Sequence, residues 1–197
     1  MSVRIAPLLG AEFQRAIPEL ARLRMEVFRE WPYLYDGTFD YEKGYIEKFE
    51  RSAGAVIIAA IDGSRVVGAS TASPLSGHAD AFAEPFKAAG HDISTIFYFG
   101  ESVLLPAYRG RGIGHKFFDA REAHAQSQPG YKHTAFCAVV RPDNHALKPA
   151  TDRKHDAFWT KRGYAKANGL VATFDWKDIG NEQKTPKPMQ FWIRPLS

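Results

Sequence analysis

Residues 96–118 read IFYFGESVLLPAYRGRGIGHKFF and combine three features in one stretch. An apolar, strand-like run up to Leu104 is followed by a proline, then by a turn with alternating glycines, and then by a helical pattern. The first backbone N–H groups of a helix lack intrahelical partners, and the helix dipole makes that end positive. Glycines allow the backbone to approach a bulky anion closely. The stretch therefore predicts a phosphate or pyrophosphate site at residues 110–115, to which Arg109 and Arg111 add positive charge.

Two common phosphate-binding motifs do not fit this turn. A dinucleotide-binding fingerprint requires G-x-G-x-x-G, but the third glycine position falls on His115 when counted from Gly110 and on Phe117 when counted from Gly112. A P-loop requires Gly before its lysine and Ser or Thr after it. Here Lys116 stands between His115 and Phe117, so neither motif is present.

The turn resembles the signature of the GNAT acetyltransferases, in which Arg or Gln is followed by x-x-Gly-x-Gly/Ala. Arg109, Gly112 and Gly114 occupy these positions. The preceding residues 104–108, LLPAY, are similar to the apolar-x-Pro-x-Tyr segment that leads into the turn in that family. The resemblance implies an acyltransferase that uses acetyl-CoA.

Length and composition set further expectations. The 197 residues fit one domain, so we expect a single acetyltransferase domain over residues 1–197. The net charge of +4 comes from scattered basic residues, which argues against nucleic-acid binding. The longest apolar run, residues 55–61, is far shorter than the ~20 residues that span a bilayer, and the N-terminus has no signal-peptide pattern. The single cysteine, Cys137, cannot form an internal disulfide, and we expect a cytoplasmic protein without membrane contact.

Hydrophobic periodicity predicts an order of elements similar to the GNAT fold. We expect an α/β (α+β) fold, with a mixed, strongly twisted sheet of about six to seven strands flanked by four or five helices. An insertion is expected near residues 74–92 and another near 145–153. The expected strands are 2–8, 55–61, 65–73, 94–104, 131–140, 170–176 and 189–193, and the expected helices are 12–29, 40–50, 79–89, 111–127 and 152–162.

The resemblance also implies where coenzyme A binds. In the GNAT fold the strand before the turn and the strand after its helix splay apart, and pantetheine lies between them like an extra strand. Asn144 stands four residues after Val140, as a pantetheine-contacting asparagine does in many relatives, although a turn-forming asparagine is the alternative. The cofactor contacts implied in this way are Ser102, Val103, Leu104, Arg109, Gly110, Arg111, Gly112, Ile113, Gly114, His115 and Asn144.

Glu101 is the expected catalytic residue. An alkylammonium has a pKa near ~10, so a carboxylate or a relayed water must take a proton before or during attack on the thioester. GNAT enzymes often place a glutamate at this point of the strand, and Gly100 beside it is typical of a bulge or of close ligand approach. The alternative is a strand-end glutamate that faces solvent or pairs with a lysine.

The chain departs from the family pattern at the expected acid. Family members often protonate the departing thiolate with the tyrosine of a Phe-Tyr-x-x-x-Gly-Phe pattern. Residues 158–164, FWTKRGY, place Trp159 at that position, and an indole is not a useful acid near neutral pH. Two alternatives stay open: protonation by water, or by another group such as His155, which precedes Trp159 by four residues on the same helical face.

The aromatic loop at residues 31–37 lies where GNAT enzymes build the acceptor pocket. Tyr33 and Tyr35 are therefore the expected substrate-binding residues, with structural plugs between helices as the alternative. Cys137 lies in an apolar strand and is expected to be a small buried hydrophobe rather than a nucleophile. The spacing of the histidines does not resemble a metal site, and we expect no structural metal.

Three functions follow from these residues. The leading hypothesis is transfer of an acetyl group from acetyl-CoA to a primary amine of a small molecule, directly within a ternary complex. A coenzyme A-binding regulatory or interaction domain without catalysis is the first alternative, supported by Trp159, and a protein N-acetyltransferase is the second. The apolar segment at residues 191–193 is compatible with a homodimer.

Overall fold

The computed structural model describes residues 3–78, 80–152 and 154–196. Within these residues the chain forms one seven-stranded sheet and five α-helices, which confirms the predicted fold class. Residue 2 of the first expected strand, residue 79 of an expected helix and residue 153 of the expected second insertion lie outside the described residues.

The sheet is mixed, with the strand order β1-β2-β3-β4-β5-β7-β6. Its neighbouring strands are antiparallel except for β4 and β5, which are parallel. The strands are β1 Arg4–Pro7, β2 Val56–Asp62, β3 Arg65–Pro74, β4 Ile96–Leu104, β5 His133–Val139, β6 Ala165–Lys177 and β7 Lys184–Pro195. The helices are α1 Gly10–Phe28, α2 Phe39–Glu50, α3 Asp80–Ala88, α4 Ile113–Gln126 and α5 Asp156–Lys161.

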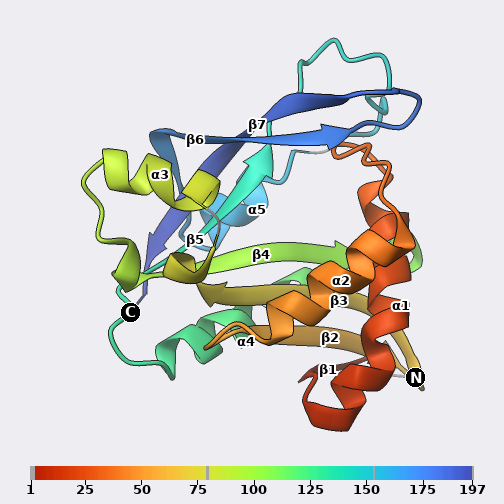
Figure 1. The fold of residues 1–197 in the computed structure, drawn as a ribbon, viewed down its shortest axis with the longest axis horizontal. Coiled ribbons are helices and arrows are strands. Elements are labelled where there is room, and N and C mark those ends of the chain that lie inside the picture. The colour runs from red at the N-terminus through yellow and green to blue at the C-terminus, as the bar shows by residue number, and fades with distance from the viewer. Residues whose placement is uncertain (1–2, 79, 153, 197) are drawn as a thin grey trace.

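Helices cover both faces of this sheet. Figure 1 shows α1, α2 and α3 on the viewer's side, and α4 and α5 behind the strands. The larger core joins the apolar faces of α1 and α4 to β1–β4, and a smaller core lies between α3 and strands β4–β7. Phe191 and Trp192, part of the segment considered for a homodimer, are buried within the chain. Among the described residues, no helix is both long enough and apolar enough to cross a bilayer.

The last two strands are much longer than the sequence predicts. Pro186 and Pro188 remove backbone donors, and proline within a run normally argues against a central strand. In the structure β5 pairs with β7 only from Met189 to Pro195. The two prolines therefore lie beyond this ladder, where they pair with Thr173 and Asp175 of β6. On the other side the Pro188 carbonyl only accepts a hydrogen bond, from the Val140 N–H at 2.9 Å, so its missing N–H is not needed.

The parallel strands β4 and β5 diverge soon after they meet. Within the described residues they pair only where Ile96–Tyr98 face His133–Ala135. Phe118 of α4 lies under the divergence, with ring centroids 6.0 Å from Phe99 of β4 and 5.7 Å from Phe136 of β5. Beyond this point β4 pairs with β3 on one side, and its other backbone edge faces the gap between the two strands.

Candidate active site

The glycine-rich turn enters α4 as the sequence predicts. Gly110 and Gly112 have φ angles of +76° and +74°, in the left-handed region that favours glycine. Gly112 is the N-cap of α4, so the helix begins at Ile113, two residues later than expected. A Cβ atom added at either glycine would meet no other atom within 4 Å. The N–H groups of the first turn of α4 therefore emerge beside an uncrowded backbone and are suited to bind an anion.

The two arginines of the turn support its backbone. Arg109 donates from Nε to the carbonyl of Leu104 at 3.0 Å and forms an ion pair with Glu30 at 2.7 Å. Arg111 donates to the carbonyl of Ala107 at 2.8 Å. Both side chains are on the surface, so they add positive charge to the turn while bracing it.

The first turn of α4 lies against α5. His115 is exposed, with its ring centroid 4.8 Å from that of Phe158. Arg162, just after α5, forms ion pairs with Asp119 at 2.7 Å and Glu122 at 2.8 Å on α4. These bonds hold the two helices together on one side of the gap.

The expected pantetheine-contacting residues lie on the diverging part of β4. Ser102 is exposed, Val103 is buried and Leu104 is partly buried. Their partners on β3 are Ser70, Ala69 and Gly68. One backbone edge of this segment is therefore paired, and the other faces the gap.

A β-bulge places Glu101 beside the gap. Gly100 and Glu101 together oppose Thr71, since Ser70 pairs with Ser102 and Ala72 with Phe99. An added Cβ at Gly100 would lie 2.4 Å from Thr71 Oγ1, so only glycine allows this approach. The Thr71 hydroxyl donates to Glu101 Oε2 at 3.0 Å, and the Glu101 N–H donates to Thr71 Oγ1 at 3.2 Å.

A buried arginine supports the bulge from the α4 side. Arg121 is 1% exposed and lies between the rings of Phe99 and Phe118, at 4.5 and 4.7 Å from their centroids. Its Nη1 donates to the carbonyls of Thr71 and Glu101, each at 3.4 Å. Burial lowers the pKa of Arg121 to about 10, so it is still cationic at neutral pH. Arg121 thus holds both strands of the bulge through their backbone.

Glu101 pairs with an arginine rather than a lysine or solvent. Its Oε1 accepts a hydrogen bond from Nη1 of Arg24 on α1, whose Nε donates to Glu42 of α2 at 2.5 Å. The side chains of Arg24, Glu101 and Glu42 are only 10%, 9% and 0% exposed. Although burial alone lowers it, the two carboxylates raise the pKa of Arg24 above its ordinary value. Arg24 and Glu42 are not among the predicted site residues; the available signal in the sequence was an arginine that continues the apolar face Ile17–Leu20 of α1.

Both expected substrate-binding tyrosines, Tyr33 and Tyr35, lie near the ion pairs of Arg24 with Glu101 and Glu42. Burial, together with the nearby Cys137 and Glu101, raises the pKa of Tyr33 above its ordinary value. Burial and the Glu42 carboxylate likewise raise the pKa of Tyr35. Both phenols are therefore protonated at neutral pH, and the structure brings them near the Arg24 ion pairs from the α1–α2 loop.

Tyr98 and Cys137 bridge β4 and β5 on the same side. The Tyr98 hydroxyl and Cys137 Sγ are 3.0 Å apart in a hydrogen bond. Burial raises the pKa of Cys137 to about 12. The residue is a neutral thiol at physiological pH, which agrees with the expected buried hydrophobe and not with a nucleophile.

His78 is a further ionisable group near Glu101. It follows β3, where its Nε2 and Ser73 Oγ are 2.7 Å apart in a hydrogen bond, and its ring contacts Phe82 and Tyr98 edge-on at 5.2 and 4.8 Å. Burial lowers its pKa to about 4, although the negative charge of Glu101 opposes this change. His78 is therefore neutral at physiological pH.

The remaining expected residues lie apart from Glu101's ion pairs. Trp159 packs against Phe136 and Trp192, with ring centroids 5.1 Å away in both cases. His155 is exposed and lies next to Trp159 at 5.7 Å. Asn144 is exposed on the segment between β5 and α5. Trp159 is therefore a partly buried side chain that packs against the core.

Comparison with known proteins gives a consistent result. Residues 18–164 match the sequence model of the acetyltransferase (GNAT) family. An aminoglycoside 6'-N-acetyltransferase complexed with coenzyme A superposes with a TM-score of 0.61 at 15% identity, over 98% of this chain and 97% of that chain. A ribosomal-protein-alanine N-acetyltransferase from Brucella melitensis gives 0.63 at 13% identity, over 98% and 99%. An N-acetyltransferase from Staphylococcus aureus Mu50 gives 0.61 at 15%, over 100% of both chains. No curated protein matches the sequence.

The environment of His78 predicts a pH-dependent stability. Because its pKa is about 4 when folded and 6.5 ordinarily, the unfolded chain binds the proton more readily between these values. This group should therefore remove roughly 3 kcal/mol from the free energy of unfolding as the pH falls from 6.5 to 4. Urea denaturation at several pH values should show a shallower loss for His78→Gln than for the wild type. His155→Gln is the matched control, and parallel curves for wild type and His78→Gln would contradict the assignment.

Proposed function

Since the chain belongs to the acetyltransferase (GNAT) family, we propose that it transfers the acetyl group of acetyl-CoA to a primary amine of a small molecule, directly within a ternary complex. One observation carries the proposal: the β-bulge and Arg24 fix the Glu101 carboxylate beside the gap between β4 and β5. A proton acceptor and the expected cofactor contacts thus both lie on the part of β4 that no longer pairs with β5.

The turn and the gap fit coenzyme A. The left-handed glycines leave open space, and the first-turn N–H groups of α4 suit a pyrophosphate. The free edge of β4 offers backbone groups to the amides of pantetheine. The residues that would hold the cofactor are Ser102, Val103, Leu104, Arg109, Gly110, Arg111, Gly112, Ile113, Gly114, His115 and, from the segment after β5, Asn144. When bound, acetyl-CoA supplies the acetyl group as an activated thioester.

Glu101 would receive the proton of the acceptor. A carboxylate has about four lone-pair positions, and Arg24 and Thr71 use only one on each oxygen. The remaining positions allow Glu101 to bind an ammonium group or a water that relays its proton. Tyr33 and Tyr35 would line the acceptor side. A backbone N–H within residues 102–104 would stabilise the negative charge on the thioester oxygen during attack.

The thiolate would be protonated from water. Trp159 packs against the core, and an indole offers no acid near neutral pH. A thiol has a pKa near ~8.5, so its thiolate is a tolerable leaving group near neutral pH and needs little assistance.

An amine panel tests the activity. Purified protein with acetyl-CoA should release free thiol in the presence of at least one small primary amine. Coenzyme A binding without turnover would favour the regulatory domain, which the presence of Trp159 at the expected position of the acid supports. Turnover only with peptides would favour a protein N-acetyltransferase.

The turn predicts a matched pair of glycine variants. Gly112→Ala forces an L side chain into a left-handed conformation, which costs about 1–2 kcal/mol, so the loop should relax away from its binding shape. Calorimetric titration with coenzyme A should show affinity reduced by about tenfold. Gly44→Ala is the control, because Gly44 lies within α2, away from the turn, and an added Cβ would meet nothing within 4 Å. Equal affinities for Gly112→Ala and the wild type would argue against binding of coenzyme A at this turn.

Glu101→Gln tests the acid–base assignment. The amide keeps the size of the side chain and can accept a hydrogen bond from Arg24, but it cannot take a proton. We expect kcat to fall by about 10²–10⁴-fold while the dissociation constant of coenzyme A stays nearly unchanged. Glu84→Gln, at an exposed glutamate of α3, should retain wild-type kcat. Parallel losses of kcat and cofactor affinity would count against Glu101 as the base.

A further inference from the structure

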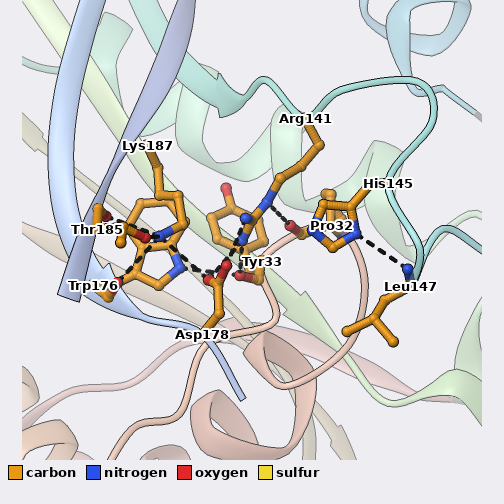
Figure 2. Close-up of polar contacts among 9 residues, drawn as sticks. All are labelled: Pro32, Tyr33, Arg141, His145, Leu147, Trp176, Asp178, Thr185 and Lys187. Atoms are coloured by element: carbon orange, nitrogen blue, oxygen red, sulfur yellow. Dashed lines mark hydrogen bonds and ion pairs between the residues drawn. The ribbon is translucent and has the colours of Figure 1, made fainter. Parts of the chain in front are cut away.

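A second buried charge cluster joins three segments that are distant in the sequence. Arg141 follows β5, Asp178 follows β6 and Lys187 lies on β7. Their side chains are only 6%, 11% and 6% exposed. Figure 2 shows them converging below the segment after β5 and beside the loop that carries Tyr33. Burying charges is costly unless their hydrogen bonds are well satisfied, so the geometry of such a cluster is strongly constrained.

Arg141 uses its guanidinium to connect a carboxylate to a loop backbone. Nη1 and Nη2 donate to the two carboxylate oxygens of Asp178, each at 2.8 Å. Nε donates to the carbonyl of Pro32 at 2.8 Å, and Nη2 also donates to the carbonyl of Tyr33 at 2.6 Å. This planar fork matches four acceptors at once, which a lysine ammonium cannot do.

Lys187 lies next to the Asp178 carboxylate, and Trp176 bonds to the loop that carries Tyr33. Lys187 Nζ lies 3.5 Å from Asp178 and donates to the carbonyl and hydroxyl oxygens of Thr185 at 2.8 and 2.5 Å. Trp176 Nε1 donates to the carbonyl of Tyr33 at 3.0 Å (Figure 2). The carbonyl of Tyr33 is therefore fixed by two donors, one from the end of β6 and one from the segment after β5.

The side chain of Tyr33 extends toward the proposed acceptor site. Its ring lies 4.9 Å from that of Phe28 and 6.0 Å from that of Trp176. The guanidinium of Arg24, which pairs with Glu101, lies 5.0 Å from the centre of the same Phe28 ring, so the Tyr33 side chain and the Glu101 ion pair are both next to Phe28. A shift of its backbone would therefore move the phenol relative to Glu101.

The same cluster anchors the segment that carries Asn144. His145 packs on Trp31 with ring centroids 5.2 Å apart, and its Nδ1 accepts a hydrogen bond from the Leu147 N–H at 3.2 Å. The aromatic loop and the segment after β5 thus meet at Arg141 and again at the Trp31–His145 contact.

We propose that Arg141 is a positioning residue for the acceptor: by binding the carbonyls of Pro32 and Tyr33, it sets the place of the Tyr33 side chain beside Glu101. This inference rests on the proposed function, because it takes Tyr33 to line the acceptor site. Among the described residues, the hydrogen bonds of Arg141 go to Pro32, Tyr33 and Asp178, and none goes to the turn or the bulge. The turn and the free edge of β4, which hold all the expected cofactor contacts except Asn144, should therefore be independent of it.

Arg141→Lys is the decisive variant, since it keeps the charge and loses the fork. With an accepted amine, KM for the amine should rise by roughly tenfold, while KM for acetyl-CoA stays near the wild-type value. In a Tyr33→Ala background, Arg141→Lys should raise the KM for the amine no further. Arg29→Met is the control, because Arg29 pairs with Asp36 of the same loop at 2.8 Å but is 58% exposed. Equal increases in both KM values, or full additivity with Tyr33→Ala, would overturn the proposal.

Hydrogen exchange tests the positioning without any substrate. The N–H groups of Leu34 and Tyr35 donate to the carbonyls of Glu30 and Phe28 at 2.9 and 2.8 Å, so they report on the loop. Their exchange should be roughly tenfold faster in Arg141→Lys, somewhat faster in the milder Asp178→Asn, and unchanged in Arg29→Met. Unchanged exchange in both cluster variants would overturn the inference. A wild type that acetylates no amine would instead refute the proposed function and leave this measurement to decide the role of Arg141 in the loop.

Discussion

The early end of pairing between β4 and β5 is the constraint on which the site depends. Three residue pairs join these strands before Phe118 of α4 lies under both of them. A continuous parallel ladder would use the backbone groups of residues 99–104 that now face the gap. The bulge at Glu101 lies on this free edge and the turn into α4 follows its end, so the divergence sets the relation between the glycine-rich turn and the Glu101 carboxylate.

Buried charges then fix the parts that surround the gap. Arg24 ties Glu101 to Glu42, Arg121 holds the bulge from the opposite face, and Arg141 ties the aromatic loop to Asp178. In each case a guanidinium bridges segments that hydrophobic packing alone would leave free to slide, because its donors lie in a fixed plane. The apolar core gives the sheet its stability, and these bridges specify where polar side chains lie.

The sequence revealed the local parts of this arrangement better than the long-range ones. The turn, the start of α4 near Gly112 and the bulge next to Gly100 follow from residues adjacent in the chain. The roles of Arg24 and Glu42 were not predicted because Arg24 lies 18 residues from Glu42 and 77 residues from Glu101 in the sequence. The extent of β7 was underestimated because Pro186 and Pro188 argue against a strand unless the neighbouring strand is known to end there.

The donor side of the proposed site depends on local sequence, whereas the acceptor side depends on long-range contacts. The donor side comes from one continuous stretch between β4 and α4, in which each glycine has a local backbone reason. The acceptor side comes from α1, α2, the loop between them and the end of the β6–β7 hairpin, and is held by contacts such as Arg141 with Tyr33. Substitutions at those long-range contacts change the acceptor side without touching the turn. In the proposed reaction, a chain built in this way can therefore alter which amine it accepts while keeping the same acetyl donor.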